Sequence, residues 1–253
     1  MESSLARVDW ILLGFISTSV FVADYSFAYK AFESSRIPLL IIAPVLLPKV
    51  SRILAKSHAY ETSVVKELNM LWQLESWLAM LIPLILNICW VDVVNIMTQN
   101  KYGESTKGIY AILSFCLPMA YITNFLWTIV FAKGNIKLTL KISALASVVN
   151  IVLNIILIKY YNATGAAIAY LASTTMQFVC YYAWVKEPHL QLRLMPYLKT
   201  LLIATLLYVL ARWLPVFWLW KVIIVSLLYI SLFYFLFYKQ QMKKALSISQ
   251  DGL

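Results

Sequence analysis

The sequence has 253 residues, of which 62% are hydrophobic, 15% are aromatic and only 13% are charged. An ordinary soluble domain has about 25% charged residues, so this chain has too few polar side chains to cover an aqueous core. We therefore exclude a water-soluble globule and predict a protein of the lipid bilayer. The six Gly and three Cys also exclude a collagen repeat and a disulfide scaffold.

Seven apolar runs are long enough to cross the membrane, which takes about 20 residues for about 30 Å of hydrocarbon. They lie at residues 14–47, 68–91, 109–132, 138–158, 163–185, 198–214 and 220–238. The first run is long enough for two pieces and contains Pro38, Pro44 and Pro48. Prolines are tolerated in membrane helices when neighbouring groups satisfy the freed carbonyls, so we expect one kinked helix. The fold class predicted is therefore an all-α integral membrane protein with about seven transmembrane helices.

The positions of the 21 Lys and Arg residues orient these spans. With seven single spans, one side of the membrane receives thirteen cations and the other six, while Lys30 and Arg36 lie inside the first span. The positive-inside rule then places the carboxyl terminus in the cytoplasm. The membrane accounts for the net charge of +10, so no nucleic-acid partner is predicted. With an odd number of spans, the same rule places the amino terminus outside, and because the amino-terminal residues lack the pattern of a cleaved signal peptide, we expect them to stay on the mature protein.

The motifs of enzymes are absent from the sequence. Loops of the predicted topology are too short for a catalytic domain, and there is no phosphate-binding glycine loop or nucleophile elbow. His58 and His189 lack Cys or carboxylate partners at metal-ligand spacing. We predict that the chain is not an enzyme and uses no metal or cofactor.

Ionisable residues inside apolar runs are the candidate functional residues, because each costs about 2.5–3.5 kcal/mol at a helix centre. Lys30, Glu33 and Arg36 fall within an arc of about 120° on the first helix. One interpretation is a self-neutralising pair with an Arg that reaches water, and the other is a cationic cavity lining that binds an anion, with Lys30 and Arg36 as ligands. Asp24, Glu33 and Glu75 are candidates for ion or proton coupling, although interfacial placement also explains Glu75.

Several segments resemble polysaccharide transporters, a family in the superfamily of multidrug and toxin extruders and the lipid II flippase. Residues 149–158 (VNIVLNIILI) and 160–170 (YYNATGAAIAY) resemble its paired-helix signature of Asn-x-x-x-Asn, a short turn and Gly-Ala-Ala-x-Ala. Matches at 9–14 (DWILLG), 25–30 (YSFAYK), 48–52 (PKVSR) and the Lys133-Gly134 turn follow in the family's order. Lys159 stands where Pro is common, and 162–164 lengthens the turn.

The resemblance implies the second lobe of a two-lobe transporter, because all matched segments belong to that lobe. Asp9 resembles the acidic residue near the end of that lobe's first helix. Residues 1–13 are then the tail of a truncated first helix, 14–185 are five helices of the lobe, and 186–253 are two further helices with a basic cytoplasmic tail. This division accounts for the odd number of spans.

The function implied by the resemblance is translocation of undecaprenyl-diphosphate-linked oligosaccharide across the bacterial inner membrane, for O-antigen, capsule or exopolysaccharide synthesis. The amino-terminal lobe would be on another chain, or the chain would be a non-functional remnant. The alternatives are an ion-coupled exporter of small molecules from the same superfamily, a membrane-embedded glycan polymerase or acyltransferase, and a non-transporting partner subunit.

Overall fold

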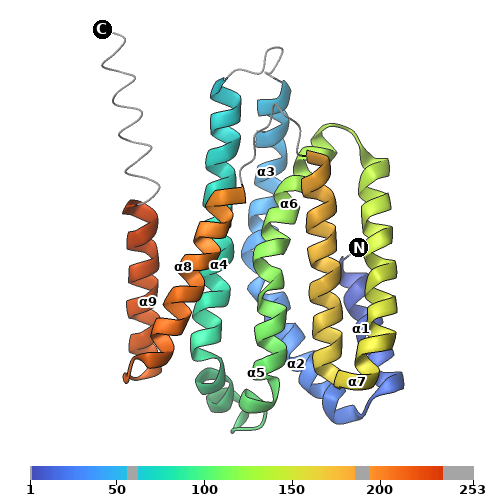
Figure 1. Cartoon of the computed structure of the whole chain (residues 1–253), viewed down its shortest axis with the longest axis vertical. Helices are drawn as coiled ribbons and strands as arrows, with labels where there is room; N and C mark the ends of the chain where they lie inside the picture. Colours follow the sequence, from blue (N-terminus) through green and yellow to red (C-terminus); the bar gives the residue numbers. More distant parts are fainter. Residues whose placement is uncertain (1, 56–61, 186–193, 236–253) are drawn as a thin grey trace.

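The computed structural model describes residues 2–55, 62–185 and 194–235, which form a bundle of long helices lying side by side (Figure 1). The helices are α1 (Glu2–Ile16), α2 (Ser19–Ser35), α3 (Ile37–Ala55), α4 (Thr62–Thr98), α5 (Gly103–Ser114), α6 (Cys116–Ala132), α7 (Ile136–Val185), α8 (Leu194–Trp213) and α9 (Trp218–Phe233). All regular structure in the described ranges is helical, which confirms the all-α fold class.

The predicted spans correspond to these helices. Four described stretches are long and apolar enough to cross a membrane: Ser19–Arg52, Asn69–Thr98, Gly103–Ala132 and Ile136–Val185. The first combines α2 and α3, the third combines α5 and α6, and the fourth contains two predicted spans within α7. α8 and α9 correspond to the last two predicted spans, with residues 236–238 outside the described part of the chain.

Two of the spans are interrupted shortly before a proline. α2 and α3 meet at Arg36, whose N–H bonds the Glu33 carbonyl at 3.1 Å, and Pro38 follows in the first turn of α3. α5 and α6 meet at Phe115, and Pro118 follows. Proline has no N–H and its ring clashes with the carbonyl four residues earlier, so each helix breaks there. Pro44 and Pro48 lie inside α3 without ending it, in line with the predicted kinked single span.

α7 consists of two limbs joined by a sharp turn at Asn162, where φ is 50° and ψ is −129° (Figure 1). This turn lies where the sequence predicts one. Gly165 allows the limbs to approach, because a Cβ at this position would collide with the Leu157 carbonyl oxygen. The Ser17 hydroxyl donates a hydrogen bond of 2.7 Å to the Asn162 side-chain oxygen, which ties the α1–α2 connection to this turn.

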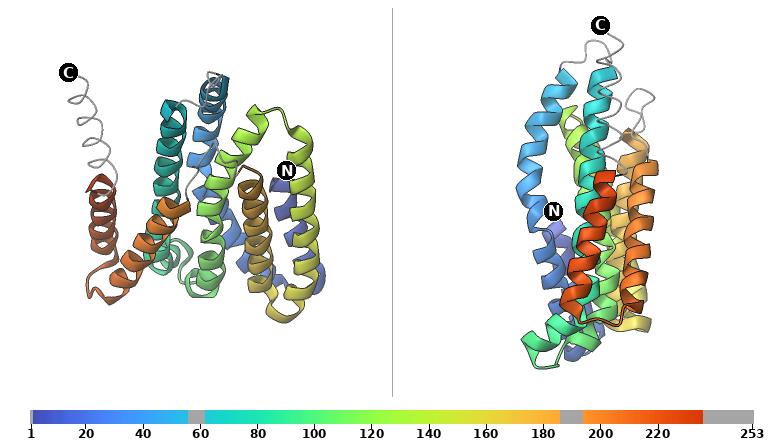
Figure 2. Two further views of the ribbon diagram at one scale, coloured as in Figure 1. Left: turned by 45° about the horizontal axis from the view of Figure 1, so that its top comes forward. Right: turned by 90° about the vertical axis from the view of Figure 1, so that its left-hand side faces the viewer.

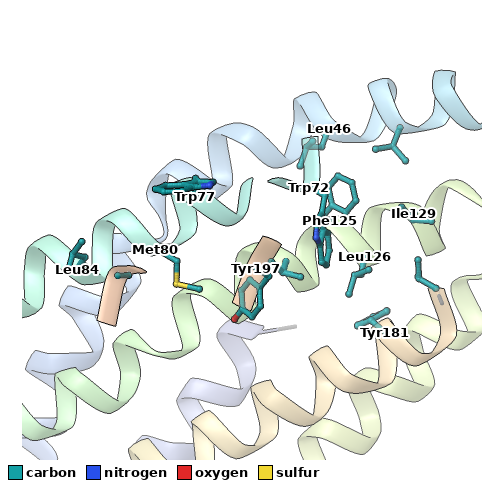
Figure 3. Close-up of a cluster of buried hydrophobic side chains, with 14 of the residues drawn as sticks. Leu46, Trp72, Trp77, Met80, Leu84, Phe125, Leu126, Ile129, Tyr181 and Tyr197 are labelled. Atoms are coloured by element: carbon teal, nitrogen blue, oxygen red, sulfur yellow. The ribbon is translucent and has the colours of Figure 1, made fainter. Parts of the chain in front are cut away.

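α8 and α9 pack against α4 at one edge of the bundle, and α1 packs against α7 (Figure 2). The core near α8 includes Trp72, Phe125 and Tyr197 (Figure 3). Large apolar side chains also cover the outside: Leu40, Ile41 and Val45 are about two-thirds exposed on α3. Such extensive exposed apolar surface is unfavourable in water and suits lipid as the solvent.

Candidate functional site

Lys30 and Glu33 form an ion pair on α2, as in the first of the two interpretations of the sequence. The Lys30 ammonium donates to a Glu33 carboxylate oxygen at 2.6 Å, and their side chains are 64% and 49% exposed. The Lys30 nitrogen also lies 5.6 Å from the centre of the Trp10 ring of α1. An exposed ion pair stabilises a protein by only about 0–1 kcal/mol, so Lys30 can exchange Glu33 for a stronger anionic partner at little cost.

Arg36 lies one turn further, at the break between α2 and α3, and is partly buried. Its guanidinium carbon is 5.8 Å from the centre of the Phe32 ring, and its charge acts on Tyr170 of α7 and Tyr121 of α6. Arg36 therefore lies at the junction of α2 and α3, within electrostatic range of α6 and α7. Together, Lys30, Glu33 and Arg36 carry a net charge of +1.

A small cavity of about 10 Å³ adjoins Phe32, between α2, α6 and α7. Ser173, Thr174 and Gln177 of α7 supply polar groups to its wall. A volume of about 10–15 Å³ accommodates one water molecule. The Ser173 and Thr174 hydroxyls both donate to the Tyr170 carbonyl at 2.9 Å, so the amide of Gln177 is the donor that this wall can offer to an anion.

Asp24 and Glu75 lie apart from the Lys30–Glu33 pair. Asp24 is buried and accepts a hydrogen bond of 2.9 Å from the Ser105 hydroxyl, which joins α2 to α5. Glu75 of α4 is 3% exposed, and neither of its carboxyl oxygens has a hydrogen-bond partner. The structure therefore does not gather the predicted ionisable residues into one cluster. His58 and His189 lie outside the described residues.

A buried polar network on Asp9 is a feature that the pattern of ionisable residues inside apolar runs does not predict. Asp9 of α1 is fully buried, and its carboxylate accepts hydrogen bonds from the Tyr25 hydroxyl at 2.9 Å and the Asn154 amide at 2.6 Å. The Asn154 amide also donates to the Asn150 carbonyl at 3.0 Å. The sequence does contain a signal for this network. Asp9 lies in an apolar segment, and Asn150 and Asn154 are four residues apart, so both Asn side chains lie on one face of their helix.

The network links both limbs of α7. The Asn150 amide donates a hydrogen bond of 3.4 Å to the Ser173 hydroxyl on the second limb. The side-chain oxygen of Asn154 is buried without a hydrogen-bond partner, so the network retains one free acceptor. It joins α1, α2 and α7 through directional bonds.

A larger cavity of about 130 Å³ lies between α4, α5, α6 and α8. Its wall is mainly apolar and includes Met80, Leu84, Pro118 and Leu201, with Tyr208 at one side. In this wall the Asn87 amide donates to the Ser114 hydroxyl at 2.8 Å and to the Pro83 carbonyl at 2.7 Å, and the Ser114 hydroxyl donates to the Ala111 carbonyl at 2.7 Å. Such a site suits an apolar ligand segment.

The arrangement of the described helices is similar to part of one solved membrane-protein structure. The solved structure of the lipid II flippase MurJ, in its inward closed conformation, is similar with a TM-score of 0.74 over 91% of this chain. The two sequences are 16% identical, so the similarity concerns the fold. This chain covers 50% of the MurJ chain and thus spans about half of its length. No family model and no curated protein matches the sequence.

Proposed function

We propose that this chain is one half of a flippase that moves undecaprenyl-diphosphate-linked oligosaccharide across the bacterial inner membrane, with its carboxyl terminus in the cytoplasm. The observation that carries the proposal is the similarity to half of a lipid II flippase. Synthesis of O-antigen, capsule or exopolysaccharide is the process that uses such a substrate, as the family resemblance of the sequence implies.

The diphosphate of this substrate requires cations in a hydrated part of the membrane protein. Arg36 suits this role because a guanidinium binds phosphate oxygens through two parallel hydrogen bonds, and Thr174 and Gln177 lie on the wall of the adjacent cavity. Lys30 is the second phosphate ligand in this proposal. Its exposed pair with Glu33 opens when the phosphate, with its larger negative charge, approaches.

The polyprenyl chain requires an apolar path open to the lipid. The cavity between α4, α6 and α8 has the volume and the apolar wall for a segment of such a chain. Tyr208 and Thr205 at this wall belong to α8, so α8 would guide the chain while α2 binds the diphosphate.

Transport would proceed by alternating access, in which one lobe rocks against the other and no covalent bond changes. The second lobe is supplied by another chain or by a second copy of this one. Asp24, Glu33 and Glu75 remain the candidates for coupling to an ion or proton gradient.

The test is a flipping assay with the chain reconstituted in vesicles, alone and together with candidate partner halves. A fluorescent undecaprenyl-diphosphate oligosaccharide is placed in one leaflet, and its arrival in the other is followed with a membrane-impermeant quencher. The double variant Lys30→Ala/Arg36→Ala should abolish flipping, and Lys159→Ala, an exposed cation on α7, should leave it unchanged. Absence of flipping with every partner would refute the function, and an unchanged rate in the double variant would refute the diphosphate site.

A further inference from the structure

Glu75 differs from Asp9 and Asp24, the other buried acidic residues among the described helices, and from the paired Glu33. Asp9, Asp24 and Glu33 each accept a hydrogen bond from a neighbouring helix or from their own helix. Both oxygens of Glu75 are buried without any hydrogen-bond partner. A buried carboxyl group without a partner in a transporter half calls for an explanation, because each such group lowers stability.

The surroundings of Glu75 are apolar. It lies one helical turn before Ala79, and Ala79 packs with Leu39 of α3 and Tyr121 of α6 in a buried cluster. The Tyr121 phenol is the titratable group that faces Glu75, and the charges of Glu75 and Arg36 both act on it. Burial dominates the environment of the Glu75 carboxyl, and no charged group on the described parts of α3, α5, α6, α8 or α9 offsets it.

An ionised carboxylate in such a place is unfavourable by several kcal/mol, and the group takes up a proton instead. From its burial and its unpartnered oxygens we therefore expect Glu75 to hold a proton in this conformation. Ionisation requires water, and α3 is the element whose movement would admit it. Pro44 and Pro48 remove two backbone hydrogen bonds from α3, and its amino end follows the break at Arg36, so we take α3 as the element that moves.

We propose that Glu75 carries an exchangeable proton, which is held between α3, α4 and α6 in this conformation and released when α3 separates from α4. The proton is then the ion that the transporter uses. This coupling role rests on the proposed function, whereas the bound proton is a property of the chain itself.

Infrared spectroscopy of the full chain in lipid vesicles tests the bound proton. The wild type should show the carbonyl band of a protonated carboxyl at neutral pH, the band should move in D₂O, and Glu75→Gln should lack this component. Glu33→Gln is the matched control and should retain it. A spectrum unchanged by Glu75→Gln would overturn the proposal, as would a Glu75 band that never moves in D₂O.

Labelling with dicyclohexylcarbodiimide, an apolar reagent specific for protonated carboxyls, tests the release. Mass spectrometry should find the label on Glu75, with less label as the pH rises. Replacing Pro44 and Pro48 by Ala restores hydrogen bonds in α3 and should slow the labelling severalfold. No label at any pH, or labelling at the wild-type rate in the Pro variant, would overturn release through α3.

These two measurements need neither substrate nor a second lobe, so they test the bound proton independently of the function. Absence of flipping combined with a proton on Glu75 would refute the function alone. Flipping by Glu75→Gln at the wild-type rate, with the same pH dependence, would overturn the coupling role.

Discussion

Replacing Gly165 by Ala should destabilise the chain by about 2 kcal/mol. The added Cβ would lie 2.5 Å from the Leu157 carbonyl carbon and 2.9 Å from the Ile158 nitrogen. These are backbone atoms, so no side-chain rotation relieves the overlap, and the two limbs of α7 must move apart. Overpacking of this kind costs about 1–3 kcal/mol, and the upper end applies here. The helix preference of Ala over Gly returns about 1 kcal/mol.

Gly108→Ala is the matched control, because no atom lies within 4 Å of the position that its Cβ would occupy in α5. This variant gains the helix preference without any overlap and should be more stable by about 1 kcal/mol. Reversible unfolding in mixed detergent micelles, followed by circular dichroism, measures both variants against the wild type. A Gly165→Ala chain as stable as Gly108→Ala would refute the close approach of the two limbs.

Three further predictions concern the polar contacts. Asn154→Leu removes a donor from the buried Asp9 carboxylate and should cost about 1.5–3 kcal/mol in the same unfolding assay; unchanged stability would contradict the network. Ser105→Ala removes the donor to the buried Asp24 and should lower the free energy of unfolding by about 1–3 kcal/mol. The control is Ser231→Ala at an exposed position of α9, which should change it by less than about 0.5 kcal/mol. Arg36→Lys keeps the charge but loses the two-bond phosphate geometry, so flipping should slow about tenfold; an equal effect of Lys30→Arg would contradict the distinct role of Arg36.

The helices follow from the sequence because apolar length is a local property. The seven predicted spans correspond to described helices, and the turn at Asn162 falls in the predicted segment. A kink in the first span was predicted from its prolines and lies at Arg36, just before Pro38, whereas the break before Pro118 was not predicted. The predicted first span begins at Gly14, whereas α1 continues to Ile16, since Gly14 in a helix interior lowers stability without ending the helix.

The candidate site was only partly predictable. The Lys30–Glu33 pair depends on spacing within one helix and is one of the two interpretations that the sequence left open, whereas the role of Lys30 and Arg36 as anion ligands stays a prediction. The Asp9–Asn154 bond joins residues 145 positions apart, so it depends on how α1 packs against α7. The burial of Glu75 likewise depends on α3 and α6, and the sequence left open whether Glu75 lies at the interface or inside the membrane.

The hydrogen bonds of Asp9 and Ser17 join α1, α2 and α7, and α3 packs against α4 and α6 through apolar side chains that include Leu39 and Leu46. α3 has 19 residues and is therefore about 28 Å long at 1.5 Å per residue. A small change of angle at Arg36 would therefore displace the carboxyl end of α3 much further than its amino end.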